Sequence, residues 1–219
     1  MSELDLRVVD DPAAEAAGLL VEAARAGHAI ALCGGSTPAR AFELAAGLEP
    51  DWSRASLWWG DERAVPPDDE HSNYKLAKEH LLDRLAHGPE VHRIQGELGA
   101  GAAADAYERE LSQLQLSLNG IGPDGHTGSL FPGKAALDVR DRRVVGTEPG
   151  LEPFVDRVTL TVPGFNAIPT LVYLVTGEGK AEPVRRAFAE DPGPETPASL
   201  VRGSALTVVL LDKAAAAYI

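Results

Sequence analysis

The chain has 219 residues, of which 44% are hydrophobic and 24% are charged. This length and composition predict one globular domain, residues 1–219, that folds without a partner. The formal net charge of -13 disfavours nucleic acids and anionic membrane surfaces as partners, because both would repel the protein.

The N-terminal residues and the apolar runs bear on cellular location. No apolar run approaches the ~20 residues that a membrane span needs, and Met-Ser-Glu-Leu-Asp at the start lacks the basic region of a signal peptide. The single cysteine, Cys33, can form neither an internal disulfide nor a cysteine-rich zinc site. We therefore expect a cytoplasmic protein without a membrane partner.

Strands and helices are predicted to alternate along the chain. A strand over residues 4–9 leads to an Ala-rich helix that begins at Pro12, after Asp11 as N-cap, and ends before Gly27. The apolar run 29–33 is typical of a buried parallel strand. Further strands are predicted at 56–59, 116–118, 157–162, 170–175 and 206–211, and further helices from about Pro38, over about 73–85, 102–114 and 180–189, and from Asp212.

This alternation predicts an α/β fold with three layers, a Rossmann-like arrangement in which helices flank a largely parallel sheet. The sequence contains no internal repeat and no linker that would divide it. Ligands of open parallel sheets bind beyond the carboxyl ends of the strands. The loops after Cys33, Trp59, Leu118 and Val175 should therefore converge on one crevice.

The loop that follows the second predicted strand is a candidate anion site. It contains Gly34, Gly35, Ser36 and Thr37 and leads directly into a helix. Free backbone N–H groups and the positive end of the helix can hold an anion there, and the two hydroxyls add donors. A plain turn with a Ser or Thr cap fits these residues equally well. The Gly-Lys-Ser/Thr ending of a Walker loop is missing.

Three charged residues, Asp61, Glu62 and Arg63, come just past the next predicted strand end. An acid or base and an anion clamp could share one site at this position. A surface cluster of weak salt bridges is the more common alternative. Asn73, in the cap and first turn of the following helix, is a further candidate site residue.

A glycine-rich segment, residues 120–133, is the most informative stretch of the chain. Its first six residues match the pattern G-x-G-x-x-G, but Pro123 lies inside the pattern and no later strand ends clearly in an acidic residue that could hold a ribose. Dinucleotide binding is therefore disfavoured. So dense a group of glycines nevertheless indicates an unusual loop path.

His126 lies in this segment, two residues after Asp124. A rigid turn can hold a neutral imidazole so that it takes a proton from water. The alternative is a histidine that merely caps a loop. Metal binding is less attractive, since His71, His80 and His126 show neither H-E-x-x-H nor another ligand spacing.

Two cations complete the candidate site. Arg157 precedes one predicted strand and Lys180 follows another. Together with Arg63 they could form a positive pocket within a negative surface. Taken singly, each is more typical of a solvated surface charge.

The motifs occur in an order that resembles the 6-phosphogluconolactonase family, from about Ala29 to the end of the chain. The motifs are Gly-Gly-Ser-Thr-Pro at 34–38, Trp-Gly-Asp-Glu-Arg at 59–63, Ser-Asn-Tyr at 72–74, Asp-Gly-His-Thr-Gly-Ser-Leu-Phe-Pro-Gly at 124–133, Arg-Val-Thr-Leu-Thr at 157–161 and Thr-Gly-Glu-Gly-Lys-Ala at 176–181. The resemblance implies a fold similar to the glucosamine-6-phosphate deaminase and ribose-5-phosphate isomerase group. It also implies hydrolysis of 6-phospho-D-glucono-1,5-lactone to 6-phosphogluconate, a step of the oxidative pentose phosphate pathway, by a monomer or weak homodimer.

Two other activities are compatible with this kind of fold. A glucosamine-6-phosphate deaminase or isomerase would use a carboxylate base at Asp61, and a sensor would bind a sugar phosphate without turnover. The motif of the deaminases resembles Asp-Glu-Tyr where this chain has Asp61, Glu62 and Arg63. Where this chain has residues 125–132, the deaminase motif resembles Gly-His-Ile-Ala-Phe-Asn-Glu-Pro. Both differences favour the lactonase.

The resemblance gives each candidate residue an expected role. His126 is the general base and then the general acid, Arg63 stabilises the oxyanion, and Asp61 positions Arg63 or the water. No metal or organic cofactor is expected. The residues expected to bind the substrate or its phosphate are Gly34, Gly35, Ser36, Thr37, Asn73, Asp124, Gly125, Arg157 and Lys180.

Overall fold

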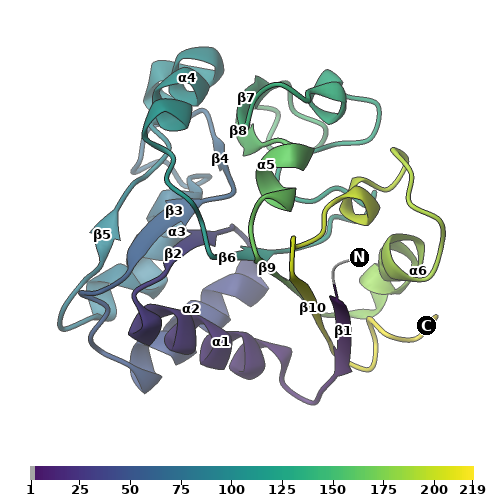
Figure 1. Ribbon diagram of the computed structural model, residues 1–219, viewed down its shortest axis with the longest axis horizontal. Coiled ribbons are helices and arrows are strands. Elements are labelled where there is room, and N and C mark those ends of the chain that lie inside the picture. The colour runs from purple at the N-terminus through teal and green to yellow at the C-terminus, as the bar shows by residue number, and fades with distance from the viewer. Residues whose placement is uncertain (1–2) are drawn as a thin grey trace.

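A computed structural model describes residues 3–219 of the chain (Figure 1). Its strands are β1 Glu3–Val8, β2 Ala29–Leu32, β3 Ser56–Trp59, β4 Asp61–Arg63, β5 Glu90–Val91, β6 Leu116–Asn119, β7 Val144–Thr147, β8 Arg157–Leu160, β9 Thr170–Val175 and β10 Leu206–Leu211. Its α-helices are α1 Pro12–Ala26, α2 Ser36–Leu48, α3 Asn73–His80, α4 Ala100–Glu110, α5 Val162–Asn166 and α6 Ala181–Phe188.

The main sheet has seven strands, all parallel, in the order β1-β10-β9-β6-β2-β3-β5. Short apolar strands such as β2, in which all four residues are buried, form its centre. Helices α1 and α2 pack against each other, and α1 also contacts β2, β9 and β10. This helix-flanked parallel sheet confirms the α/β fold that the alternation predicts.

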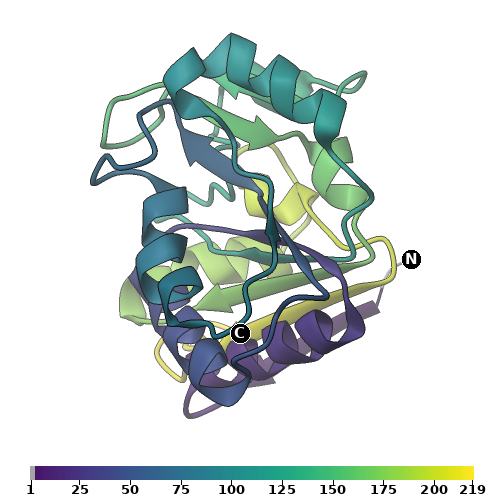
Figure 2. The ribbon, with the colours of Figure 1, turned by 90° about the vertical axis from the view of Figure 1, so that its left-hand side faces the viewer.

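A smaller antiparallel sheet, in the order β4-β8-β7, is separate from the main sheet. It lies with α4 at the opposite end of the molecule from α1 and α2 (Figures 1 and 2). The segment 157–162 was expected in the parallel sheet, and that expectation is wrong. The strand β8 pairs instead with β4 and β7, and it ends where the Thr161 hydroxyl accepts a hydrogen bond from Gly164 N–H and starts α5.

The predicted ends of the first helix are confirmed. The Asp11 carboxylate accepts a hydrogen bond from Ala14 N–H (3.2 Å), and Gly27 ends α1 with φ 75°. The predicted helix from Asp212 is wrong, because the chain forms turns there. Asp212 accepts hydrogen bonds from the N–H groups of Gly177 and Ala215.

Other predicted elements differ in their bounds. Helix α3 ends at His80 rather than near 85, and α4 ends at Glu110 rather than near 114. The strands β4, β5 and β7 and the short helix α5 were not predicted. Among residues 3–219, no helix is both long and apolar enough to cross a membrane.

Glu62, the central residue of β4, is a buried carboxylate that is 2% exposed. Its Oε1 accepts hydrogen bonds from Arg63 N–H and Asn73 N–H, both at 2.7 Å. Its Oε2 accepts from Tyr74 N–H at 2.8 Å and from the Ser72 hydroxyl at 3.1 Å. Burial raises the pKa of Glu62 to about 7, although the backbone hydrogen bonds act in the opposite direction. Glu62 therefore holds the first turn of α3 against β4.

We expect Glu62→Gln to lower the free energy of unfolding by about 1–3 kcal/mol, because a carboxamide NH₂ group would face donors that now bind a carboxylate. Urea unfolding measures this change. The same substitution at the exposed Glu70 is the control and should cost less than about 0.5 kcal/mol. Equal costs at the two positions would show that the Glu62 hydrogen bonds do not hold α3.

Candidate functional site

A cavity of about 400 Å³ opens at the carboxyl ends of β2, β6 and β9. Residues from the segments that follow β2, β3, β6 and β9 line it together, as predicted from the sequence, but the segment after β3 is the strand β4 and not a loop. The lining includes ten of the candidate site residues: Gly34, Gly35, Ser36, Thr37, Asp61, Arg63, Asn73, His126, Arg157 and Lys180. Asp124 and Gly125 are not among the lining residues, and Asp124 contacts the lining residue His126.

His126 is held by the Asp124 carboxylate. The Nδ1 atom of His126 lies 2.5 Å from Asp124 Oδ1, and the same oxygen accepts a hydrogen bond from His126 N–H at 3.1 Å. Burial alone would raise the pKa of Asp124, but the hydrogen bonds and charge of His126 outweigh it and lower that pKa. Since the carboxylate accepts from Nδ1–H, the lone pair of the neutral ring is on Nε2.

The loop that carries His126 closes tightly around the ring. Gly122 N–H donates a hydrogen bond to the His126 carbonyl at 2.8 Å. A Cβ at position 122 would lie 2.0 Å from both Nδ1 and Cε1 of the imidazole, so only glycine leaves room for the ring in this position. Phe131 contacts the ring, with centroids 4.5 Å apart. The glycines and the aromatic side chain thus fix the direction of the imidazole.

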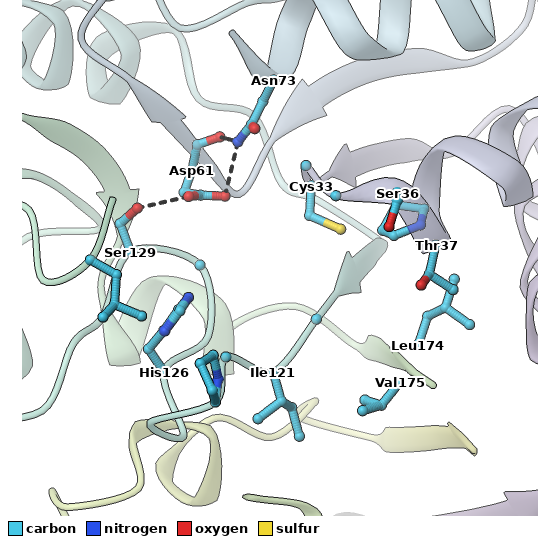
Figure 3. A pocket seen from close by; sticks show the side chains of 18 of the residues that line it. Cys33, Ser36, Thr37, Asp61, Asn73, Ile121, His126, Ser129, Leu174 and Val175 are labelled. Carbon is cyan, nitrogen blue, oxygen red and sulfur yellow. Dashed lines mark hydrogen bonds between the residues drawn. The ribbon is translucent and has the colours of Figure 1, made fainter. Parts of the chain in front are cut away.

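Asp61 is held in the cavity wall by two other side chains (Figure 3). The Ser129 hydroxyl donates to Asp61 Oδ2 at 2.7 Å. Asn73 Nδ2 donates to the Asp61 carbonyl at 2.9 Å and to Oδ1 at 3.3 Å. Asn73 Oδ1 is buried and has no hydrogen-bond partner within residues 3–219, so it is an acceptor that a ligand donor could satisfy.

The charged residues 61–63 do not form the surface salt-bridge cluster that was the alternative. Asp61 and Glu62 are both buried, and within the described residues none of the three side chains takes part in an ion pair. The Arg63 guanidinium donates to the His71 carbonyl. Its Nε is buried and lacks a partner within residues 3–219.

Arg63 and Arg157 lie directly opposite each other in the β4–β8 register. Like charges at such positions destabilise an antiparallel pair. Burial lowers the pKa of Arg157, and the charge of Arg63 lowers it further. The Arg157 guanidinium donates to the carbonyls of Val155, Pro153 and Leu151 at 3.0, 2.8 and 3.2 Å. An anion in the cavity that both side chains line would relieve their repulsion.

Lys180 is a third cation at the cavity. Its Nζ donates to the Ile121 carbonyl at 2.7 Å, which places it beside the loop of His126. Burial lowers the pKa of Lys180, and the nearby Asp124 charge offsets part of that effect. Three cations therefore line one cavity in a chain whose formal charge is -13.

The N-terminus of α2 forms another part of the wall. Its N-cap is Gly35, with φ 117°, and no side chain in the described part of the chain caps the helix, so the alternative of a Ser or Thr cap is wrong. The uncapped N–H groups and the helix dipole favour an anion at this point. The Thr37 hydroxyl lies 3.0 Å from that of Thr176. Ser36 and Thr37 face the cavity from the side opposite His126 and Ser129 (Figure 3).

Some lining residues were not predicted as site residues. Ser129 lies in the same glycine-rich segment as His126, and Thr176 begins the motif that contains Lys180, so proximity to a predicted residue was the available signal for both. Glu152 gave none. Within residues 3–219, no three His, Cys, Asp or Glu side chains form a group that could hold a metal ion.

Comparisons with known proteins agree with the motifs. A profile of the family described as glucosamine-6-phosphate isomerases/6-phosphogluconolactonase matches residues 5–210. The chain is 38% identical to 6-phosphogluconolactonase of Mycobacterium leprae, over 90% of this chain and 87% of that protein. It is 37% identical to 6-phosphogluconolactonase of Homo sapiens, over 86% of this chain and 79% of the human protein.

Solved structures show the same arrangement of elements. The structure of 6-phosphogluconolactonase from Thermotoga maritima has a TM-score of 0.83 at 29% identity and covers 96% of this chain and 100% of its own. A monomeric glucosamine-6-phosphate deaminase has a TM-score of 0.84 at only 18% identity over 99% of this chain and 100% of its own, so that likeness concerns the fold alone. On the extent of the profile match and the identity to these relatives, the chain belongs to the glucosamine-6-phosphate isomerase/6-phosphogluconolactonase family.

Proposed function

We propose that this protein hydrolyses 6-phospho-D-glucono-1,5-lactone to 6-phosphogluconate, a step of the oxidative pentose phosphate pathway, without a metal or organic cofactor. One observation carries the proposal: His126, fixed by Asp124, lines the same cavity as an uncapped helix N-terminus and three cations. The relatives named 6-phosphogluconolactonase support the choice of substrate.

In the proposed mechanism, His126 Nε2 accepts a proton from a water molecule as that water attacks C1 of the lactone. The carbonyl becomes a tetrahedral oxyanion, which Arg63 stabilises with N–H donors. The intermediate then collapses, the bond from C1 to the ring oxygen breaks, and the imidazolium returns its proton to the departing oxygen. Asp124 accepts from Nδ1–H throughout and stabilises the imidazolium.

The phosphate of the substrate is assigned to the α2 N-terminus, residues 34–37, with Arg157 and Lys180 as counter-charges. Ser36 and Thr37 lie across the cavity from His126, so a substrate can reach both ends of the site (Figure 3). Hydrogen bonds to charged groups contribute about 1.5–3 kcal/mol each. Several of them would fix the position of the lactone ring as well as its affinity.

We assign Asp61 a positioning role and not the role of a base. Both of its carboxylate oxygens already accept hydrogen bonds, from Ser129 and from Asn73. The unpartnered Oδ1 of Asn73 would accept a hydrogen bond from a sugar hydroxyl. Asp61 pairs antiparallel with Thr159 in the β4–β8 ladder, which also contains Arg63. Asp61 therefore helps to hold this strand at the cavity.

Direct assay of the lactone tests the proposed activity. The lactone is generated in situ, and its disappearance is followed with and without the protein in the presence of a chelator, against spontaneous hydrolysis as background. Faster disappearance is expected. Release of ammonia from glucosamine 6-phosphate would instead identify a deaminase, and calorimetric binding without turnover would identify a sensor.

His126→Ala should lower kcat by about 10²- to 10⁴-fold, because it removes the proposed general base and acid. Asp124→Asn should give a smaller loss, since the amide cannot stabilise an imidazolium as a carboxylate does. Steady-state kinetics and an unchanged circular dichroism spectrum would separate catalysis from folding. Near-native kcat in His126→Ala would rule out the proposed mechanism.

Gly122→Ala should lower kcat by up to about 10²-fold without changing any group that reacts, because the new methyl would displace the imidazole. Gly120→Ala is the matched variant in the same loop, where a Cβ has nothing within 4 Å. It should lose much less activity. If both variants kept the native kcat, the position of the ring would not limit the reaction.

Lys180→Ala should raise KM for the phosphorylated lactone by about 10-fold or more and change kcat less, as expected for loss of one charged hydrogen bond. Lys213→Ala removes an exposed lysine and serves as the control. The corresponding lactone without phosphate should show no such dependence on Lys180. An unchanged KM for the phosphorylated substrate would place the phosphate elsewhere.

A further inference from the structure

The strand β1 forms one end of the main sheet (Figure 1). Within residues 3–219 it pairs with β10 alone. Glu3 N–H donates to Ala205 O and Val9 N–H donates to Leu211 O, so the odd-numbered residues direct their backbone groups toward β10. In a parallel ladder the even-numbered residues then direct their N–H and C=O groups outward. Leu4, Leu6 and Val8 therefore present an unpaired edge.

The side chains of β1 divide into an apolar and a charged face. Leu4, Leu6 and Val8 lie on one face and are 45%, 39% and 48% exposed. Asp5 and Arg7 lie on the other face, where Arg7 Nε donates to Asp5 Oδ2 at 2.9 Å. The strand contains no lysine and no proline, the residues that commonly protect an edge strand from pairing.

We propose that β1 pairs antiparallel with β1 of a second copy of this chain, about a two-fold axis through Leu6. In this register Leu6 faces Leu6 of the second copy and Leu4 faces Val8, all as hydrogen-bonded pairs that use the outward backbone groups. Asp5 faces Arg7 of the other copy at a non-hydrogen-bonded position, where side chains approach most closely. The two sheets become one continuous sheet.

The charges of β1 disfavour the two nearest registers that the backbone also allows. A two-fold axis through Asp5 would place two aspartates opposite each other, and an axis through Arg7 would place two arginines opposite each other. A shift of one residue in the pairing would match outward-facing residues with residues already bonded to β10. Of these three axes, only the one through Leu6 places no like charges opposite each other, and it forms an unbroken apolar row from Leu4, Leu6 and Val8 of both copies.

A charge exchange tests the register. Sedimentation velocity over a range of protein concentrations should show a dimer of the native chain at physiological ionic strength, where screening limits repulsion between two acidic copies. Asp5→Arg and Arg7→Asp should each shift the chain to monomer by placing like charges opposite each other. The double variant with both substitutions should restore the dimer, because every pair is again of opposite charge.

Cysteine crosslinking provides a second measurement that does not depend on charge. Leu6→Cys should form an intermolecular disulfide under mild oxidation, since hydrogen-bonded pairs have Cα atoms about 5.5 Å apart, within the range of a disulfide. Leu4→Cys alone should not crosslink, but a mixture of Leu4→Cys and Val8→Cys chains should give the mixed dimer. The native Cys33 is buried and serves as the background in every sample.

The control is Leu48→Lys, which places a charge at an exposed leucine on α2 and should leave the dimer intact. Leu6→Lys should abolish the dimer, because two lysines would meet on the axis. A native chain that stays monomeric at every concentration, a dimer that survives Leu6→Lys, or a double charge variant that stays monomeric would each overturn the proposal. Preferential crosslinking of Leu4→Cys to itself would overturn the register.

Discussion

The antiparallel pairing of β4 with β8 is the constraint on which the cavity depends. The chain leaves the parallel sheet after Gly60, whose carbonyl accepts a hydrogen bond from Leu160 N–H, and β4 then runs along β8. This pairing brings Arg63 and Arg157 together at the cavity. The buried Glu62 carboxylate, from the same strand, holds α3 and so places Asn73 beside Asp61. The small antiparallel sheet thus contributes one wall of the cavity, at the carboxyl ends of the strands of the main sheet.

Electrostatics explains how an acidic protein can hold an anion. Three cations line the cavity, and two of them, Arg63 and Arg157, lie opposite each other in the β4–β8 ladder. Arg157 and Lys180 lose hydration on burial. Backbone carbonyls around Arg157 and Lys180 compensate part of this loss. They are neutral, so they leave the positive charge available. The cost of repulsion in the free protein becomes a gain when an anion enters, although Asp61 in the cavity wall and Asp124, whose charge acts on Lys180, offset part of the positive charge.

The sequence predicts the parallel sheet and most of the cavity wall because both depend on local patterns. Buried strands are apolar runs, and glycines and hydroxyls follow their carboxyl ends. The small sheet could not be placed in this way. Its strand β8 reads Arg-Val-Thr-Leu, and only the alternation of polar and apolar residues distinguishes it from a parallel strand. The Arg63–Arg157 opposition and the hydrogen bond from Ser129 to Asp61 arise from pairing between distant segments, which no local pattern reveals.

The cavity and the edge proposed for pairing lie at different parts of the main sheet. The cavity is built at the carboxyl ends of β2, β6 and β9, and no residue of β1 or β10 lines it. In the sheet order, β10 and β1 lie between β9 and the edge with which a second copy would pair. The strands of that copy would therefore be separated from the cavity by both β10 and β1. Association through this edge therefore brings no side chain of the second copy into the site through the sheet itself. In the proposed dimer each cavity would keep its own imidazole and its own cations, and the proposed chemistry requires only one chain.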